Sequence, residues 1–340
     1  MSIFNTSPPA IDEKTLENWL LKNYDFLNDG IISFKKLNSE RDFNIKIITK
    51  KNKKFVVKIS NPAENLNILK LQDSMLKYLS SSDIKHFIPI PLHDDIKNLK
   101  DLNNRKCFVR ILTFLDGEVF ANNQNNEILC KNLSKFLGNL TLSLEKFEHP
   151  FAHRKFTWNS SDIEWIEDYI NLFSENSKKD IIKIVLKSFK LNIKPKLSKI
   201  RYSIIHGDAN NYNILVSNND IVGLLDYGDS IYAPSICELT VALAYSLMNS
   251  SNIIDKCSYM VKSFHSIFPL TKIEIELLST FIASRLLITV TMANIQKKKY
   301  PNNEYLTISE NDAWNLLFKL KDINLDNLTL DLLKICNYEK

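Results

Sequence analysis

The chain has 340 residues, and its 44 lysines and arginines against 39 aspartates and glutamates leave a formal net charge of +5. This charge is too mild, and the basic residues are too scattered, to indicate a nucleic-acid-binding surface. The five cysteines show no metal-ligand spacing, and their odd count argues against a disulfide framework. The length suits two lobes with sizeable cores, and no Pro- or Gly-rich linker separates independent domains.

The first segment, Met1–Lys14, lacks the basic stretch and the following apolar run of a secretion signal. No segment reaches the roughly twenty apolar residues of a membrane span. The unpaired cysteines suit a reducing compartment. We therefore expect a cytoplasmic protein without a membrane partner, either a monomer or a homodimer.

Three short segments in the first quarter of the chain are rich in β-branched and aromatic residues, and polar turns separate them. They are Ile31–Phe34, Phe43–Ile48 and Lys54–Ile59. This pattern predicts a small antiparallel sheet. Phe108–Phe114 predicts a further strand, and Leu115–Glu118 follows it as a turn.

Most other segments have the 3.6-residue apolar period of helices. The predicted helices are Glu64–Leu79, Asn126–Phe147, Ser235–Leu247, Ile273–Ile295 and Glu310–Leu320. Ser235 precedes Glu238 at the spacing of a helix-capping box. From Asn126 onward the chain is therefore expected to be mainly helical.

A motif of polar residues, His206–Asn213, precedes a second one, Asp226–Asp229. Between them lie two short apolar runs, Ile214–Val216 and Ile221–Leu225, joined by four turn-forming residues. These runs predict a hairpin, which would return the second motif to the neighbourhood of the first. The two motifs should therefore form one site.

The residue types in these motifs suit phosphoryl transfer, which needs an acceptor for the hydroxyl proton and oxygen ligands for Mg²⁺. Asp208 is the candidate for the first role. Asn213 and Asp226 are the candidate metal ligands. The alternative is that the two motifs are ordinary loops without a catalytic role, and their order and spacing argue against it. A hydrolytic metal site at His206 and Asp208 would need further ligands, and no His or Cys cluster lies nearby in the sequence.

Arg285 interrupts the most hydrophobic predicted helix. A charge in such a position is usually paired in a core. The carboxylates of the two motifs are the obvious partners, and contact with an anionic part of a substrate is the alternative.

Several stretches together resemble the aminoglycoside phosphotransferase and choline kinase superfamily, and within it the hydroxylysine kinase branch. Besides the two motifs, they are Leu37–Asn44, Phe55–Pro62 and Glu238–Leu239. The resemblance runs from about Ile31 to the end of the chain. It implies an α+β, bilobal, protein-kinase-like fold, with a small antiparallel-sheet lobe at residues 1–115 that binds ATP and a larger, mainly helical catalytic and substrate lobe at residues 116–340.

The resemblance also implies the nucleotide contacts. It places Lys58 on the strand that carries the ATP-phosphate lysine, although composition alone would make it a solvent-facing strand residue. The family's Lys partner aligns best with Gln72, and Glu64 is the other candidate. The remaining implied contacts are Ser39 and Arg41 in the loop that covers the phosphates, and backbone groups from Thr113 to Leu115 beside the adenine ring.

An ATP- and Mg²⁺-dependent phosphotransferase is thus expected, acting on the hydroxyl of a small, cationic amine, amino alcohol or hydroxy amino acid such as hydroxylysine or homoserine. Asp229 and Glu238 are candidate ligands for an ammonium group. Trp158 and Tyr232 are candidate cation–π walls, although such residues more often only pack. The open alternatives are an aminoglycoside-type antibiotic kinase and a nucleotide-binding pseudokinase. A protein kinase is disfavoured, because little room for an activation segment follows Asp229.

Overall fold

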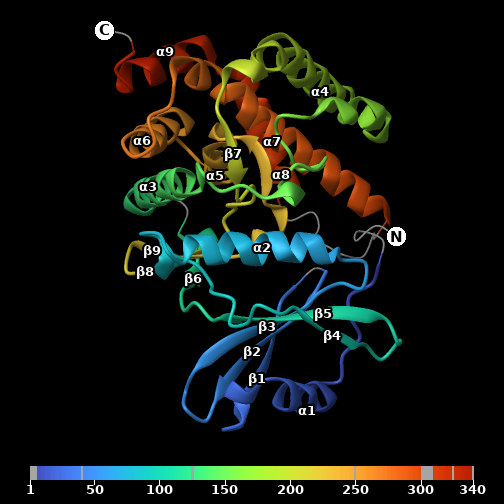
Figure 1. Cartoon of the computed structure of the whole chain (residues 1–340). Helices are drawn as coiled ribbons and strands as arrows, with labels where there is room; N and C mark the ends of the chain where they lie inside the picture. Colours follow the sequence, from blue (N-terminus) through green and yellow to red (C-terminus); the bar gives the residue numbers. More distant parts are fainter. Residues whose placement is uncertain are drawn as a thin grey trace. The chain divides into compact units, whose positions relative to one another are not determined.

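The computed structural model describes residues 6–39, 41–123, 126–248, 250–299, 309–323 and 325–338. The chain forms two compact units that divide between Asp116 and Gly117, one residue after the boundary expected from the sequence. The larger antiparallel sheet belongs to the first unit, and most of the helices belong to the second (Figure 1). The α+β composition predicted from the sequence is confirmed.

The first unit is built on a five-stranded antiparallel sheet with the order β1-β2-β3-β5-β4. Its strands are β1 (Ile31–Leu37), β2 (Phe43–Thr49), β3 (Lys54–Ile59), β4 (Lys97–Lys100) and β5 (Lys106–Thr113), and its helices are α1 (Glu13–Asn23) and α2 (Leu66–Leu79). The predicted strands are all present. Helix α2 begins two residues later than expected, because Asn65 accepts a hydrogen bond from the backbone N–H of Asn67 as its N-cap.

The two faces of this sheet differ in chemistry because side chains alternate along each strand. One face, which includes Ile45 and Val57, packs with Leu20 of α1 into a core of buried apolar residues. On the other face, Lys58 of β3 lies opposite Arg110 of β5 in the strand register. Cationic side chains therefore stand on the face away from α1.

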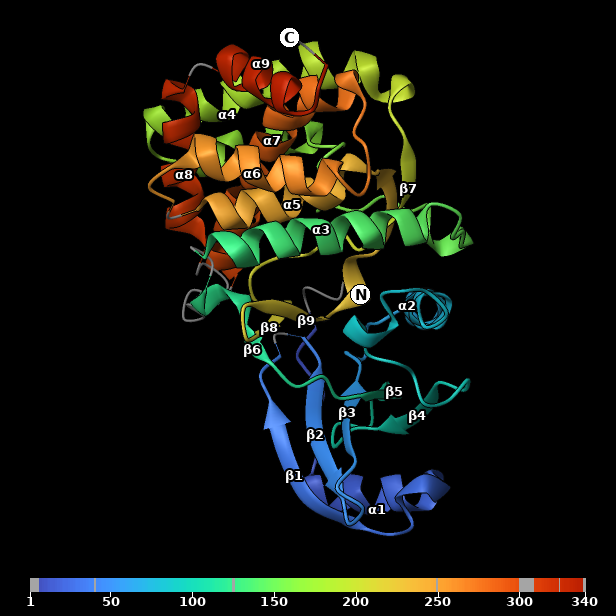
Figure 2. The ribbon, with the colours of Figure 1, turned by 90° about the vertical axis from the view of Figure 1, so that its left-hand side faces the viewer.

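The second unit contains two small sheets and a group of helices. Its strands are β6 (Glu118–Val119), β7 (Tyr202–Ile205), β8 (Ile214–Ser217), β9 (Asp220–Leu224) and β10 (Ile231–Pro234), and its helices are α3 (Glu127–Leu144), α4 (Asn176–Ser188), α5 (Ile236–Leu247), α6 (Ile253–His265), α7 (Lys272–Lys299), α8 (Glu310–Asp322) and α9 (Leu325–Ile335). Helices α3, α5 and α6 lie side by side (Figure 2). The predicted helices correspond to α3, α5, α7 and α8, whereas α4, α6 and α9 were not predicted individually.

Helix α7 is the central helix of the second unit. By length and composition it could cross a membrane, but 89% of its apolar window is buried inside the protein. The expectation that no segment reaches such a length was therefore wrong. A long apolar helix is also what the core of a large helical lobe requires.

The capping box predicted at the start of α5 does not form. The Ser235 hydroxyl pairs with the Ser203 hydroxyl of β7 at 2.8 Å and makes no cap hydrogen bond. The Glu238 carboxylate turns to the chain segment after β7, where it accepts the backbone N–H of His206 at 2.6 Å. Tertiary hydrogen bonds have replaced the local ones, which ties α5 to this segment.

Candidate active site

Asp208 lies on the loop that follows β7, and the backbone of that loop depends on Gly207. Gly207 has φ +77°, a conformation that L side chains rarely adopt. A Cβ atom there would also lie 3.0 Å from the Asp229 carbonyl oxygen. The glycine therefore permits both the turn and the close approach of the Asp229 loop, which brings the two sequence motifs together.

The hairpin of β8 and β9 brings Asn213 and Asp226 to the same place, as predicted. Its turn residues, Asn218 and Asn219, both have positive φ, as tight hairpin turns require. At the open end, the Leu225 N–H donates to the Asn213 carbonyl at 2.8 Å. Asp226 follows directly, with the left-handed φ of 59°. The two candidate metal ligands thus lie next to each other although they are thirteen positions apart in the sequence.

The hydrogen bonds of Asn213 determine which way its side-chain amide points. Its Nδ2 donates to the Asp208 backbone carbonyl at 2.9 Å and to the Asp208 Oδ2 at 2.8 Å. Both partners are acceptors, so the amide nitrogen must face them. The Asn213 Oδ1 therefore points away from Asp208, and it is the oxygen that could reach a cation.

These two residues suit Mg²⁺ held together with a nucleotide. Within the described part of the chain, no three His, Cys, Asp or Glu side chains gather as a self-contained metal site. Mg²⁺ commonly binds through one or two protein oxygens, with phosphates and water completing its octahedron. One amide oxygen from Asn213 and one carboxylate from Asp226 match that ligand set.

His206 and Glu238 hold the Asp208 loop from inside. The His206 Nδ1 accepts the Asp208 N–H at 3.2 Å, so its Nε2 carries the proton and donates to the Leu225 carbonyl at 2.9 Å. Burial lowers the pKa of His206 to about 4, which keeps the ring neutral. The ring therefore joins the Asp208 loop to the residue before Asp226.

Asp208 pairs with Arg285 of α7, as expected from the sequence. The Arg285 Nη2 lies 2.9 Å from the Asp208 Oδ1, and the Asp208 side chain is 21% exposed to solvent. Burial raises the pKa of Asp208, the Asp229 and Asp226 carboxylates raise it further, and Arg285 together with Asn210 opposes them. An accessible carboxylate with a raised pKa, held by a fixed cation, has the properties of a general base.

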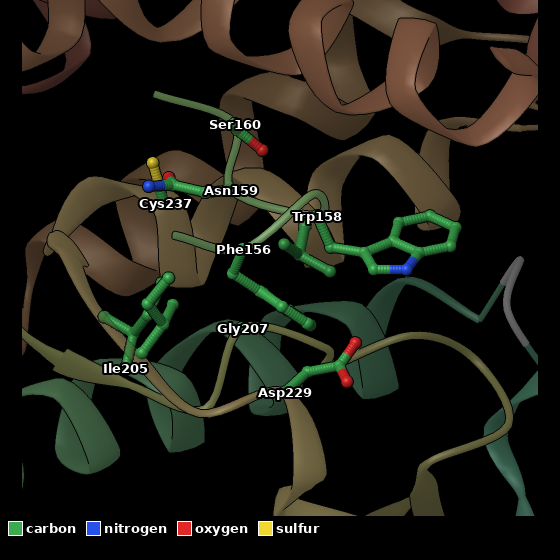
Figure 3. A pocket seen from close by; sticks show the side chains of 10 residues that line it. Phe156, Trp158, Asn159, Ser160, Ile205, Gly207, Asp229 and Cys237 are labelled. Atoms are coloured by element: carbon green, nitrogen blue, oxygen red, sulfur yellow. The ribbon is translucent and has the colours of Figure 1, made fainter. Parts of the chain in front are cut away.

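A pocket of about 240 Å³, open to solvent, lies beside this loop within the second unit. The residues that line it are Phe156, Trp158, Asn159, Ser160, Ile205, Gly207, Asp229, Ile231, Cys237 and Val241. In Figure 3 the segment with Phe156 and Trp158 forms one wall, and the Asp229 carboxylate faces it from the opposite side. The pocket thus combines a mainly apolar lining with one carboxylate, next to the loop of Asp208.

Two of the four predicted substrate residues, Trp158 and Asp229, line this pocket. Tyr232 instead stacks between Tyr202 and His153, with ring centroids 5.5 and 4.3 Å away. Glu238 is fully buried and holds the His206 backbone. Packing and loop anchoring are therefore the roles that the structure gives to Tyr232 and Glu238.

In the first unit, Gln72, the best-aligned candidate partner of Lys58, is hydrogen-bonded to Arg110, a residue that the sequence did not single out. Arg110 donates from Nη2 to the Gln72 Oε1 at 2.7 Å and from Nη1 to the Asp73 Oδ1 at 2.8 Å. All three side chains are buried. Glu64 precedes α2, and burial raises its pKa. Arg110–Asp73 is thus a buried ion pair between the sheet and α2.

The other predicted nucleotide residues of the first unit lie in turns and at a strand end. The Ser39 Oγ accepts the Asp42 N–H at 3.2 Å, so Ser39 closes the turn that also contains Arg41. The Thr113 hydroxyl accepts the Ile90 N–H at 2.8 Å at the end of β5, and Leu115 follows. These positions agree with a loop between β1 and β2 and a connection after β5. Nucleotide contact by these residues stays a prediction.

Residues 33–253 match the family described as the phosphotransferase enzyme family, and this range is more than half of the 340-residue chain. The chain belongs to this family. It is therefore a small-molecule kinase. Hydroxylysine kinase of Mus musculus is 27% identical to it over 290 residues, which cover 79% of this chain and 77% of the relative.

Two solved structures share the fold. A microcompartment-associated aminopropanol kinase matches with a TM-score of 0.72 and 13% identity, over 95% of this chain and 99% of that one. The amicoumacin kinase hAmiN, in complex with AMP-PNP, Ca²⁺ and Ami, matches with a TM-score of 0.65 and 14% identity, over 90% and 93% of the two chains. The predicted family resemblance and kinase-like fold are thereby confirmed.

Proposed function

We propose that this protein transfers the terminal phosphoryl group of Mg²⁺-bound ATP to the hydroxyl group of a small amine, amino alcohol or hydroxy amino acid, with hydroxylysine as the preferred acceptor. The observation that carries the proposal is the orientation of Asn213. Its amide nitrogen binds Asp208 and leaves its oxygen for a cation beside Asp226. One side chain thus couples the candidate base to the candidate metal site.

The residues of the chain divide the chemistry among them. Asp208 accepts the proton of the acceptor hydroxyl as its oxygen becomes the nucleophile, a role worth roughly a hundredfold or more in rate. Asn213 and Asp226 would hold Mg²⁺, and Lys58 would contact the phosphates. Mg²⁺ and ATP together supply the phosphoryl group and neutralise its charge. The named relatives support this assignment, since one is a hydroxylysine kinase and another holds an ATP analogue with a divalent cation.

The pocket beside Asp208 favours an acceptor with a single cationic group near its carboxylate. Its lining has a single carboxylate, Asp229, which can receive one ammonium group through charge-assisted hydrogen bonds. A polycationic aminoglycoside would need more acidic contacts, so this lining favours an acceptor such as hydroxylysine.

The test is a screen of the purified protein for acceptor-dependent ADP release. Hydroxylysine, homoserine, choline and an aminoglycoside are compared at equal concentration with Mg²⁺ and ATP. We expect the highest kcat/KM with hydroxylysine and no acceptor-dependent signal with unhydroxylated lysine, which lacks the nucleophile. Tight binding of Mg²⁺-ATP without turnover of any acceptor would leave a nucleotide-binding pseudokinase as the better description.

The cysteines bear on the compartment in which the enzyme works. Cys107, Cys130, Cys237, Cys257 and Cys336 are buried and form no disulfide. Buried thiols outside disulfides suit a reducing compartment. We therefore propose a cytoplasmic enzyme whose partner is its small substrate, acting as a monomer or homodimer, and size-exclusion chromatography with light scattering measures that state.

A further inference from the structure

The loop that carries the candidate base contains no positive charge of its own. Its residues, His206–Asn213, include one carboxylate and three side-chain amides but no lysine or arginine. The cation that contacts Asp208 comes from α7, 77 residues later in the chain. A charge supplied from so far away requires its own explanation.

The contacts of Asp208 show what this cation does. The Oδ2 atom accepts from the Asn210 Nδ2 at 2.9 Å and from the Asn213 Nδ2 at 2.8 Å. The Oδ1 atom accepts from the Arg285 Nη2 at 2.9 Å. Asn210 and Asn213 belong to the same loop as Asp208, so they move with it. Arg285 is the contact that ties the carboxylate to the rigid helical core.

Arg285 is itself held on its other side by Trp158, which lines the pocket beside Asp208, hereafter the acceptor pocket. Its Nη1 donates to the Trp158 carbonyl at 3.2 Å, and its guanidinium carbon lies 4.7 Å from the centre of the Trp158 ring. Tyr245 of α5 lies on the guanidinium as well, at 5.6 Å. Trp158 lines the pocket beside Asp208. One buried guanidinium therefore contacts both the candidate base and a wall of the acceptor pocket.

The burial of Arg285 is costly, which argues for a functional use. The side chain is 1% exposed, and its Nε has no hydrogen-bond partner among the described residues. A buried ion pair is weak as a source of stability, because desolvation offsets the attraction. Buried donors without partners are rare and tend to occur at functional sites. An apolar side chain in α7 would suit the core better than this arginine.

We propose that Arg285 is a positioning residue for phosphoryl transfer, which holds Asp208 at a fixed place relative to the Trp158 wall and so aligns the acceptor hydroxyl with its base. The proposal rests on the proposed function of this site. Arg285 acts through Asp208 and Trp158 and does not itself take the proton. Its loss should disturb the acceptor side of the reaction and leave the nucleotide side unchanged.

The test compares Arg285→Ala and Arg285→Lys with the wild type, using the acceptor that the wild type turns over best. A misplacement of about 1 Å costs about a hundredfold in rate, so we expect Arg285→Ala to lower kcat by about that factor and to raise the KM of the acceptor. The KM of ATP should stay within about twofold. Lysine keeps the charge but lacks the planar fork, so Arg285→Lys should recover only part of the rate.

Chemical rescue separates positioning from simple loss of structure. Guanidinium ion at non-denaturing concentration should raise the kcat of Arg285→Ala by at least about tenfold, because it can occupy the site between Asp208 and Trp158. This gain should saturate with guanidinium concentration. Arg201→Ala is the matched control, since Arg201 pairs with the buried Glu274 at 2.6 Å in the same unit. That variant should lose thermal stability without guanidinium-dependent gain in kcat.

Several results would overturn the inference. A folded Arg285→Ala enzyme with kcat and acceptor KM within about twofold of the wild type would do so. So would an equal loss of ATP affinity, or the absence of rescue. If the alanine variant does not fold, Arg285→Lys decides the question, because its kcat and acceptor KM should change while its KM for ATP does not. If the wild type phosphorylates none of the screened compounds, only the proposed function is refuted. The variants and the wild type are then compared by their rates of uncoupled ATP hydrolysis, in which water takes the place of the acceptor.

Discussion

Glu238 should make the stability of this protein depend on pH in a way that its amide analogue does not. The carboxyl group is fully buried, and burial raises its pKa from the ordinary 4.5 to about 7, although the N–H groups of His206 and Gly207 oppose the shift. Between these two values the folded protein retains a proton that the unfolded chain has lost. The free energy of unfolding therefore falls as the pH rises through this window.

The size of the effect follows from the shift. At about 1.4 kcal/mol for each unit, Glu238 should cost the folded state about 3 kcal/mol between pH 4.5 and pH 7. Glu238→Gln has no proton to lose. His206 acts in the opposite direction, since its lowered pKa makes stability rise with pH, but it is present in both proteins and cancels in the difference.

The assay is urea denaturation of the wild type and Glu238→Gln at a series of pH values from 4.5 to 8. The difference between the two free energies of unfolding, wild type minus variant, should fall by about 3 kcal/mol as the pH rises across this window. Glu145→Gln, which neutralises an exposed carboxylate of the same unit, is the control. A difference that stays constant, or that rises with pH, would refute the buried, proton-retaining state of Glu238.

Three further substitutions test other parts of the structure. Arg110→Met should leave the buried Asp73 without its partner, which should cost about 3–5 kcal/mol of stability in the first unit and raise the KM of ATP. A double variant with Asp73→Leu should regain stability. An unchanged melting temperature of Arg110→Met would contradict the buried pair. Asn213→Ala should raise the Mg²⁺ concentration for half-maximal rate by at least about tenfold, since ligand-shell losses cost roughly 10–100-fold, and an unaltered Mg²⁺ titration would exclude Asn213 as a ligand. Gly207→Ala should lower kcat and the melting temperature together, because its Cβ would meet the Asp229 backbone in a left-handed conformation, and normal values for both would refute that constraint.

The hairpin and the residues at its open end could be predicted from the sequence because their information is local. Asn213 and Asp226 are separated by two apolar strands and a tight turn, and the strand pairing leaves little freedom in where their backbones meet. The pairing of Arg285 with a carboxylate also followed from a simple rule, that a charge in an apolar helix needs a partner.

The contacts that the sequence did not predict join distant segments whose local patterns have a simpler interpretation. Ser235 and Glu238 match a capping box, yet Glu238 binds His206 across 32 residues. Arg110 looks like one polar residue in a strand, but it lies opposite Lys58 and binds α2. Periodicity cannot reveal such pairs, because they depend on which faces of the sheet and helix meet. The unexpected buried Arg110–Asp73 pair is the clearest example.

The central claim is that Asp208 takes the proton of an alcohol while Asn213 and Asp226 hold the metal-bound nucleotide. The most direct measurement compares Asp208→Asn with the wild type in hydroxylysine-dependent ADP release, together with calorimetric binding of Mg²⁺-ATP. The account predicts that turnover falls by at least about a hundredfold while the affinity for Mg²⁺-ATP is preserved. Near-normal turnover of the asparagine variant would contradict it.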